Sequence, residues 1–496
     1  MSSVSAVIMA AGQGTRMKSA MPKVLHLVAG KPMVWYMAAL ARRVADSAVA
    51  IVIGHGAEQV RAYLDHETST LAPFAVVEQT EQLGTGHAVQ QARSVVVGET
   101  QPVAKHCLIL NGDTPLLTEA TVRTLLDSHE SSQATVTILT TILENPKGYG
   151  RVVRGSESQV LQIVEDRDAN DREKSIQEVN VGTYVVNTSF LFESLETLQP
   201  QNAQGEYYLT DIIGMAVAQN LRVSALVTSD TKETIGINNR EHLALAECEM
   251  RQRVCRKWMQ EGVTLVDPSR TSIDADVVIG RDSTLYPDVQ LEGRTVLGES
   301  CTVRSHTRIT NSIVGDRTKV LDCCVIDETE IDHGAKIGPF AHLRPGTQIR
   351  SGAKVGNFVE LKKTELGEGS KANHLTYLGN TVIGRKVNIG AGTITCNYDG
   401  YRKAKTVIED HVFIGSDTQL IAPIKVGRGA MIAAGTTLTH DVPAEALGIS
   451  RQVQLNKEGA AKRKRDLQTQ KSSETISNPA VHDKQAEDFS SQKGEL

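Results

Sequence analysis

A glycine-rich turn with two nearby cations lies close to the start of the chain. An apolar run over residues 4–9 continues into Ala10-Ala11-Gly12-Gln13-Gly14-Thr15-Arg16, and Lys23 follows shortly afterwards. Glycine lets backbone N–H groups come close to an anionic ligand, and a cation offsets phosphate charge. The pattern indicates a phosphate-binding loop, although a glycine-rich turn alone is weak evidence.

An aspartate follows a second apolar run. Asp113 comes just after residues 107–110, in the segment Asn111-Gly112-Asp113-Thr114-Pro115. Ligands of α/β sheets bind at the carboxyl ends of the strands, which favours a metal-binding role for this carboxylate. Aspartate is also common in turns, so the residue by itself leaves both interpretations open.

A histidine in the second half stands among charged and polar residues. His374 is preceded by Arg344, Glu360 and Lys362 and followed by Tyr377. Histidine is a natural general base near neutral pH, and a neighbouring carboxylate can orient its ring. Without further context, His374 is better explained as a surface histidine.

The elements that must position these residues differ between the two halves. In the first half, short apolar runs at 4–9, 48–53, 74–77 and 107–110 alternate with helix-like stretches. This rhythm is typical of βαβ units, so we expect an α/β domain with a parallel sheet.

In the second half, an apolar residue recurs at every sixth position. The longest runs are Ile279, Leu285, Leu291, Leu297, Val303 and Ile309; Ile331, Ile337, Leu343, Ile349, Val355 and Leu361; and Ile408, Ile414, Leu420, Val426, Ile432 and Leu438. This period predicts a parallel β-helix in which three hexads form one coil. Antiparallel strands would instead show a period of two. The pattern does not determine handedness.

One interruption falls between Ile389 and Ile408. Residues 390–405 are polar and glycine-rich and too long for a turn between coils, so we expect an extruded loop. Insertions in solenoids tend to cluster on the working face.

Composition places limits on the remaining possibilities. The net charge of -5 predicts no nucleic-acid partner, and the seven cysteines lack paired metal spacing. Neither a secretory signal nor a run long enough to span a membrane is evident, so we expect a cytoplasmic protein. The expected organisation is an α/β domain over 1–240, a linker helix of roughly 30 Å over 241–261 that holds the domains apart, a β-helix over 262–453 and a disordered polar tail over 454–496.

The motifs together carry a family resemblance. Residues 9–17, 22–25, 81–88, 111–115, 148–151, 163–165, 178–182 and 236–240 resemble the signatures of sugar-nucleotide pyrophosphorylases. With the hexapeptide half, including 344–346, 356–363, 374–379 and 396–400, residues 3–455 are similar to the bifunctional bacterial family of N-acetylglucosamine-1-phosphate uridyltransferases and glucosamine-1-phosphate acetyltransferases. The resemblance implies a Rossmann-like nucleotidyltransferase domain and a left-handed β-helix.

The resemblance assigns roles in the first domain. Asp113 and Asn238 would hold one Mg²⁺ between the phosphates of UTP, while Arg16 and Lys23 would offset the triphosphate charge. Further nucleotide contacts would come from Met9, Ala10, Ala11, Gly12, Asn111 and Gly112, uracil contacts from Gln79, Gly84 and Thr85, and contacts with the N-acetylated sugar from Gly150, Glu165 and Asn180. The family usually has Leu and Tyr where this chain has Met9 and Asn111, so nucleotide preference could differ.

The resemblance also assigns roles in the second domain. His374, beside Glu360, would deprotonate the amine of glucosamine 1-phosphate, and Asn397 would stabilise the oxyanion formed from acetyl-CoA. The sugar phosphate would be bound by Arg344, Lys362, Tyr377 and Asn388, and acetyl-CoA by Ala391, Asn397, Tyr398, Ser416, Ala434 and Arg451. A homotrimer is implied, with acetyl-CoA sites between neighbouring columns.

The resemblance implies a two-step enzyme that makes UDP-N-acetylglucosamine for peptidoglycan and lipopolysaccharide synthesis. Two alternatives remain open: a sugar-1-phosphate nucleotidyltransferase with a non-catalytic, trimerising β-helix, and a trimerising scaffold with an inactive sugar-nucleotide domain. The presence of His374, Asn397 and Tyr398 together disfavours the first, and that of Lys23, Asp113 and Asn238 disfavours the second.

Overall fold

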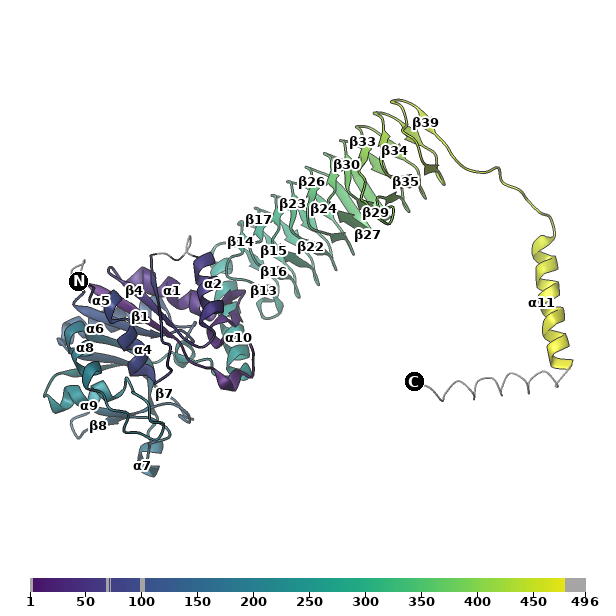
Figure 1. Ribbon diagram of the computed structural model, residues 1–496. Helices are drawn as coiled ribbons and strands as arrows, with labels where there is room; N and C mark the ends of the chain where they lie inside the picture. Colours follow the sequence, from purple (N-terminus) through teal and green to yellow (C-terminus); the bar gives the residue numbers. More distant parts are fainter. Residues whose placement is uncertain (1–2, 68–70, 72, 99–102, 478–496) are drawn as a thin grey trace.

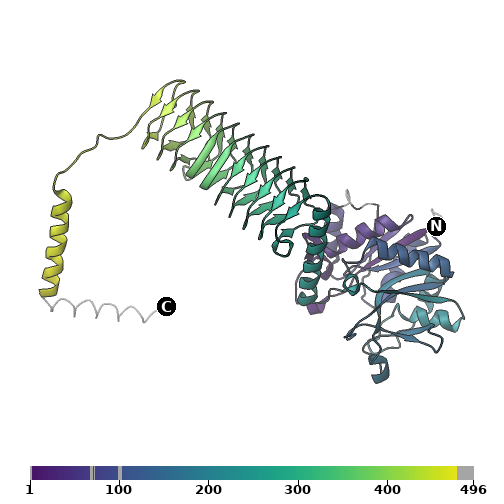
Figure 2. The same cartoon turned by 180° about the vertical axis from the view of Figure 1, so that it is seen from behind.

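The computed structural model describes residues 3–67, 71, 73–98 and 103–477. An α/β half, purple to teal in Figure 1, is followed by helix α10 (Arg240–Gln260) and a long column of short strands. Figure 2 shows the same elongated arrangement from behind, with α10 at the junction. The expected fold class, α/β followed by a parallel β-helix, is confirmed.

One mixed sheet forms the centre of the α/β half, in the strand order β11-β7-β10-β6-β1-β4-β5 with β8 and β9 at one side. The strands are β1 (Val4–Ala10), β4 (Val49–Ile53), β5 (Ala75–Glu78), β6 (His106–Asn111), β7 (Val136–Ile142), β8 (Arg151–Arg154), β9 (Val160–Val164), β10 (Glu178–Asn187) and β11 (Val223–Thr228). The prediction of a parallel sheet was wrong for β10, which runs antiparallel to both β6 and β7. The hairpin β8–β9 comes before β10 and reverses the direction of the chain, so β10 enters the sheet antiparallel to β7.

Helices cover both faces of this sheet. They are α1 (Met33–Val44), α2 (Ala57–His66), α4 (Thr85–Gln91), α5 (Arg93–Val96), α6 (Glu119–Ser132), α8 (Thr188–Thr197) and α9 (Asp211–Ala218). The short helix α7 (Asp171–Lys174) lies beside β8 and has no buried residue. Successive residues of β1 point to opposite faces: Ile8 packs into one core with Leu40 of α1, and Val7 into another with Leu191 of α8.

The second half stacks short parallel strands on three faces. One face contains β14 (Val278–Ile279), β17 (Val296–Leu297), β20 (Ile313–Val314), β23 (Thr329–Ile331), β26 (Thr347–Ile349), β28 (Glu365–Leu366), β30 (Thr381–Ile383), β33 (Thr406–Ile408) and β36 (Ile424–Val426). The two other faces are formed by β12 (Thr264–Leu265), β13 (Ser272–Ile273), β15 (Thr284–Leu285), β16 (Gln290–Glu292), β18 (Thr302–Val303), β19 (Arg308–Thr310), β21 (Lys319–Val320), β22 (Val325–Asp327), β24 (Lys336–Ile337), β25 (His342–Leu343), β27 (Lys354–Lys362), β29 (Lys371–Gly379), β31 (Asn388–Ile389), β32 (Ile394–Cys396), β34 (Phe413–Ile414), β35 (Gln419–Ile421), β37 (Met431–Ile432), β38 (Thr437–Leu438) and β39 (Leu447–Gly448).

The six-residue period corresponds to the inward-facing positions of the β-helix. Leu285 pairs with Val303 and Leu291 with Ile309, one coil further along the chain. All members of the three predicted runs are buried in a single continuous core. Inward residues therefore stack on one another from coil to coil.

The extruded loop is shorter than predicted. Residues 394–396 form β32, and the buried Thr395 pairs with Leu420 in the next coil. The hexad pattern counted only aliphatic residues, so it missed the inward position that this threonine occupies. The predicted loop therefore began too early. The loop leaves the column only after Cys396 and returns at β33.

The tail differs from its prediction. Residues Ala460–Ser477 form helix α11, where the sequence predicted disorder; residues 478–496 lie outside the described part of the chain. The segment is rich in Ala, Lys, Arg and Gln, which favour helix without a buried face. In both views α11 stands away from the β-helix.

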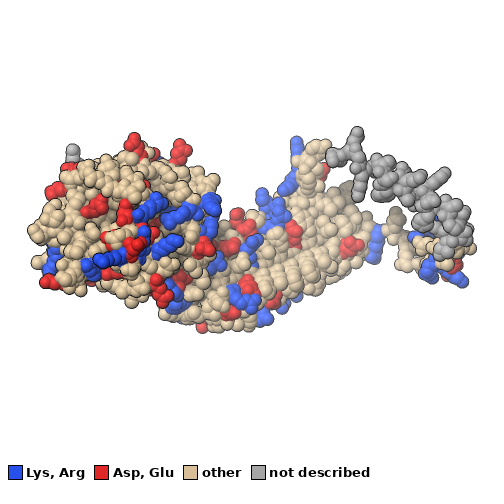
Figure 3. Space-filling model, turned by 90° about the horizontal axis from the view of Figure 1, so that it is seen from below, with Lys and Arg blue, Asp and Glu red and all other residues tan. Residues whose placement is uncertain are grey.

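On the face of the molecule shown in Figure 3, positively and negatively charged side chains of the described residues are interspersed. Among the described residues, no helix combines the length and the apolar character needed to cross a membrane.

Two buried histidines contact each other between β6 and α6. His129 Nε2 lies 3.0 Å from His106 Nδ1, and His129 Nδ1 lies 2.8 Å from the Thr137 hydroxyl. Burial, with smaller contributions from His106 and Lys105, lowers the pKa of His129 to about 4 against the opposing effect of Glu130. The pKa of His106 is also lowered, mainly by burial.

We expect the α/β half to lose stability as the pH falls from about 6.5 to about 4. In this window the unfolded chain binds a proton at His129 that the folded chain does not, so one such group costs up to about 1.4 kcal/mol per pH unit. Urea unfolding followed at pH 7, 6 and 5 should show a flatter pH dependence for His129→Gln than for the wild type. The exposed His440 provides the control, because His440→Gln should leave the slope unchanged.

Candidate active sites

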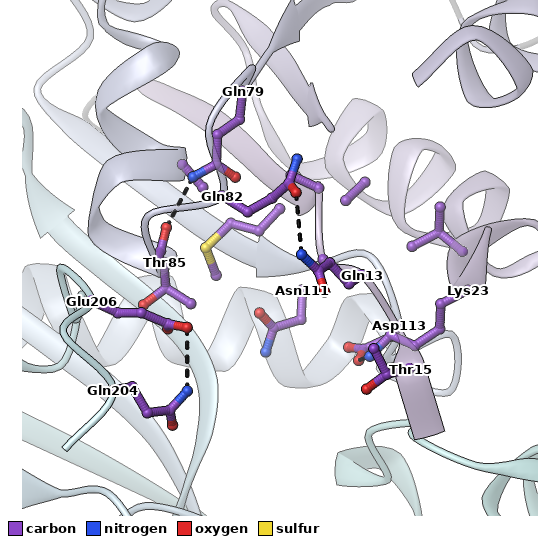
Figure 4. A pocket seen from close by; sticks show the side chains of 17 residues that line it. Gln13, Thr15, Lys23, Gln79, Gln82, Thr85, Asn111, Asp113, Gln204 and Glu206 are labelled. Atoms are coloured by element: carbon purple, nitrogen blue, oxygen red, sulfur yellow. Dashed lines mark hydrogen bonds and ion pairs between the residues drawn. The ribbon is translucent and has the colours of Figure 1, made fainter. Parts of the chain in front are cut away.

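A cavity of about 480 Å³ opens at the carboxyl ends of β1 and β6. The predicted residues that line it are Met9, Ala10, Ala11, Gly12, Lys23, Gln79, Gly84, Thr85, Asn111 and Asp113. Figure 4 shows the hollow from close by, with Gln204 and Glu206 on the side away from Lys23 and Asp113. The sequence motifs did not indicate Gln204 and Glu206, because no charge or glycine pattern marks them. Gln13, Thr15 and Gln82 lie inside the motifs, but no role was predicted for them.

Close backbone packing explains the first loop. Gly14 has a φ of 61°, and a Cβ on it would lie 2.7 Å from the Cβ of Lys23. A larger residue would therefore be strained and would displace the lysine. Gly112 does not line the cavity; its N–H donates to the Met9 carbonyl at 2.9 Å, which ties the end of β6 to β1.

Cations and oxygen donors converge at one end of this cavity. Lys23 forms an ion pair with Asp113 and also donates to Asn238 Oδ1 at 3.2 Å. Arg16 Nη2 donates to the same Asn238 oxygen at 3.0 Å. Two segments far apart in the sequence thus meet, as the motifs predicted.

The donor set is suited to a hard cation. The Asp113 carboxylate and the Asn238 amide oxygen both contact one ammonium group, so they can face one small positive charge. Among the described residues, no group of three or more His, Cys, Asp or Glu side chains could hold a metal. Mg²⁺ is commonly held by one or two protein oxygens, with phosphate and water as the other ligands, and the pair fits that pattern.

The far end of the cavity is shaped by hydrogen bonds. Gln79 Nε2 donates to the Gly84 carbonyl at 3.1 Å and lies 3.0 Å from His87 Nδ1. Gly86 N donates to the Tyr207 carbonyl at 2.7 Å, and the Thr85 hydroxyl accepts from Leu209 N at 3.0 Å. The motif around Gly84 is thereby fixed against the segment that carries Glu206.

A second cavity of about 200 Å³ adjoins the first. The three predicted sugar-contact residues, Gly150, Glu165 and Asn180, line it. Burial raises the pKa of Glu165, with smaller contributions from Asp168, Asp211 and Asp166, while a hydrogen bond from Thr210 at 3.3 Å opposes the shift.

Four residues line both cavities: Met9, Thr85, Asn111 and Asp113. Asn111 Nδ2 donates to the Val181 carbonyl at 3.2 Å. Gly182 has a φ of 80°, and a Cβ there would lie 2.1 Å from Asn111 Nδ2, so the glycine leaves room for this side chain. The two hollows therefore meet beside the cation cluster.

In the β-helix, four of the predicted residues, Glu360, Lys362, His374 and Tyr377, lie on its two longest strands, β27 and β29. Their register places Asn357 beside His374 and Glu360 beside Tyr377. His374 is exposed and borders a hollow of about 380 Å³. Glu360 accepts from Arg344 at 2.8 Å, and within the described part of the chain no residue forms a hydrogen bond with the His374 ring.

Several positive charges lie near Lys362. Arg344 and then Lys403 are the largest causes that lower the pKa of Lys362, and Glu360 opposes them. Tyr377 and Asn397 converge nearby: a Cβ on Gly379 would lie 2.5 Å from the Tyr377 hydroxyl and 2.8 Å from Asn397 Nδ2. Asn397 Nδ2 also donates to Asn380 Oδ1 at 3.0 Å.

Asn388 is not brought to this cluster within one chain. It pairs with Lys371 and Phe413, whereas Tyr377 pairs with Glu360 and Ile394. Asn388 and Tyr377 therefore belong to different columns of outward residues.

The remaining predicted residues follow one edge of the column. Asp417 N donates to the Ala391 carbonyl at 2.7 Å, and Gly435 N to the Ser416 carbonyl at 2.8 Å. Arg451 Nη1 donates to the Ala434 carbonyl at 2.8 Å, and Tyr398 is exposed on the extruded loop. The small residues Ala391, Ser416 and Ala434 thus form a line along successive coils, and this line ends at the positively charged Arg451.

Two family models match parts of the chain. A nucleotidyl transferase family model matches residues 5–260, and a bacterial transferase hexapeptide model matches residues 405–440. A solved UDP-glucose pyrophosphorylase complexed with UDP-glucose covers 51% of this chain and 100% of its own, at 16% identity and a TM-score of 0.42.

Curated relatives extend over nearly the full length. The bifunctional protein GlmU of Trichlorobacter lovleyi is 48% identical over 93% of this chain and 99% of its own length. That of Shouchella clausii is 46% identical over 93% of this chain and 100% of its own. The nucleotidyl transferase half, the hexapeptide half and the nearly full-length identity lead to one conclusion: the chain belongs to the GlmU family of bifunctional proteins.

Proposed function

We propose that the chain catalyses two successive reactions. In the β-helix, acetyl-CoA acetylates glucosamine 1-phosphate; in the α/β half, the N-acetylglucosamine 1-phosphate formed attacks UTP to give UDP-N-acetylglucosamine and pyrophosphate. The observation that carries the proposal is the junction of the two cavities beside Asp113, Lys23 and Asn238. A nucleotide in one hollow and a sugar phosphate in the other would meet there.

Positioning and charge neutralisation account for the uridylyl step. The larger cavity would hold UTP, with Gln79, Gly84 and Thr85 near the uracil, and the smaller would hold the sugar beside Glu165 and Asn180. Lys23 and Arg16 would stabilise the charge that develops as a sugar phosphate oxygen attacks the α-phosphorus and pyrophosphate leaves. Mg²⁺, held by Asp113 and Asn238, supplies further charge neutralisation when bound.

The acetyl step needs a base, an anion site and a donor groove. His374 would take the proton from the amine that attacks the thioester carbonyl, Asn397 would stabilise the oxyanion, and coenzyme A would leave as its thiol. Lys362 and Arg344 supply the positive charge for the sugar phosphate. Ala391, Ser416, Ala434 and Arg451 follow an edge along which an extended acyl donor could lie.

We propose that the acetyl site is completed by a homotrimer. Phe340, Phe358 and Leu375 lie on neighbouring coils beside His374, and each adopts a positive φ. Their exposures are 49%, 59% and 63%, and the two phenylalanine rings stack at 5.2 Å. An apolar ridge of this kind favours a protein partner, and Asn388 of another copy could complete the site that one chain leaves without it.

The competing function is a nucleotidyltransferase with a non-catalytic β-helix. Mass-spectrometric product analysis with glucosamine 1-phosphate, acetyl-CoA, UTP and Mg²⁺ separates the two. Formation of UDP-N-acetylglucosamine only when all are present supports the two-step proposal, whereas UDP-glucosamine formed without acetyl-CoA would support the alternative.

Asp113→Ala should reduce uridylyl transfer by about 10³-fold or more, because a key oxygen donor at the phosphates is lost. Pyrophosphate release with N-acetylglucosamine 1-phosphate and UTP measures this step. Acetyl transfer by the same variant should remain within about twofold of wild type. Loss of both activities in a folded variant would contradict the assignment of separate sites.

His374→Ala should show the reverse pattern. Removal of the base should slow acetyl transfer by about 10²-fold to 10⁴-fold, measured as coenzyme A thiol release. Uridylyl transfer from supplied N-acetylglucosamine 1-phosphate should be unaffected. Normal acetyl transfer would exclude His374 as the base.

Phe358→Ser should weaken the trimer and with it acetyl transfer. Analytical ultracentrifugation is expected to show smaller species at micromolar concentration, while uridylyl transfer persists. Ile313→Ser, at an exposed apolar position on another face, is the matched control and should remain trimeric. A Phe358→Ser protein with unchanged mass would place the interface elsewhere.

A further inference from the structure

A short hairpin connects the cation cluster to the junction between the two halves. Lys23 begins the 3₁₀ turn Lys23–Leu25, which is followed by β2 (Leu27–Val28) and β3 (Lys31–Pro32). The turn of this hairpin, Ala29–Gly30, has φ angles of 44° and 79°. Its tip points away from the nucleotide cavity toward α10 and the β-helix, as the following contacts show.

The tip is held on two sides. Glu247 of α10 accepts from Ala29 N at 2.6 Å, and the Ala29 carbonyl accepts from Ala275 N of the first β-helix coil at 2.9 Å. A Cβ on Gly30 would lie 2.4 Å from Asp274 Oδ2, so the two halves touch here without space for a side chain. The expectation that α10 simply holds the domains apart was therefore wrong.

An ion pair crosses the same junction. Lys31 Nζ lies 2.5 Å from Asp276 Oδ2 of the β-helix and 3.9 Å from Glu67 Oε2 of the α/β half. The Lys31 side chain is only 13% exposed and lies over the Trp35 ring. Loss of a partner from a poorly hydrated ion pair leaves a charge that water solvates incompletely, so Asp276 should matter more than a typical surface carboxylate.

The base of the hairpin is attached to both sides of the cation cluster. Arg240 Nη1 lies 3.2 Å from His26 Nδ1. The segments that follow Lys23 and Asn238 are therefore in contact, as Lys23 and Asn238 themselves are. A small core continues this connection: Met17 from the Arg16 turn packs with Val28 and Ala29 of the hairpin and with Ile237 and Ala246, which precede and follow Asn238.

We infer that the Ala29–Lys31 tip is a positioning element for uridylyl transfer, and that the β-helix holds it in place through Asp276. This inference rests on the proposed function of the α/β half. The hairpin, its small core and the His26–Arg240 contact transmit the restraint to Lys23 and Asn238. Lys31 and Asp276 contact no substrate; they determine the positions of Lys23 and Asn238.

Asp276→Asn in the full-length protein tests the inference. We expect kcat for uridylyl transfer to fall about tenfold, with a smaller change in KM for UTP, because small displacements of charge-stabilising groups affect the transition state most. Asp276→Glu should recover most of the rate, since it restores the charge. Acetyl transfer should remain as in the wild type.

Hydrogen exchange measured by mass spectrometry gives a readout that needs no activity. Asp276→Asn should raise amide exchange in residues 14–31 severalfold. Glu299→Gln is the matched control, because it removes a carboxylate from another ion pair of the β-helix, Arg281–Glu299 at 3.1 Å, and should change neither exchange nor rate.

The outcomes separate the two proposals. A wild-type protein without uridylyl transfer would contradict the proposed function, and exchange in residues 14–31 would then decide whether Asp276 restrains the hairpin. An active wild type with unchanged kcat and exchange in Asp276→Asn would overturn the positioning role. Equal losses of both activities together with a lower melting temperature would also overturn it, since Asp276 would then only stabilise the fold.

Discussion

Parallel stacking inside a narrow column is the constraint on which the second half depends. Each inward side chain rests on one from the preceding coil, as Leu343 does on Ile326, so the register cannot slip by one residue without turning the aliphatic core outward. The same register fixes the outward columns. Glu360 therefore lies beside Tyr377, although a whole coil of chain separates them. The stacked core thus determines which outward residues can form a site.

The first half reaches its site by a different route. Strand ends and loops converge on it, so each wall belongs to another segment and is fixed by a few hydrogen bonds, such as Gly86 N to the Tyr207 carbonyl. Charge is balanced within the walls, where Lys23 contacts Asp113. Glu165 is the contrasting case, because burial raises the pKa of its carboxyl group and so favours the uncharged form.

The sequence predicted features that repeat or that form local motifs, and it missed features that depend on long-range geometry. The hexad period identified the β-helix, and the glycine-rich motif led to the cavity around Lys23. The reversed direction of β10 and the wall formed by Gln204 and Glu206 have no local signature, because they follow from where the chain returns to the sheet. Thr395 hid an inward position because the pattern counted only aliphatic residues.

The coil corner beside His374 has an unusual backbone conformation. Phe358 and Leu375, at φ angles of 58° and 45°, are bulky residues in a conformation that usually belongs to glycine or asparagine. Such residues cost on the order of 1–3 kcal/mol each and persist only where the surroundings enforce them. The same corner has a positive φ in the preceding coils, at Cys323 and Phe340, so the regular stacking of the coils enforces this conformation. Leu375 directly follows His374, so the stacking that holds the strained corner also fixes the direction in which this histidine leaves the backbone.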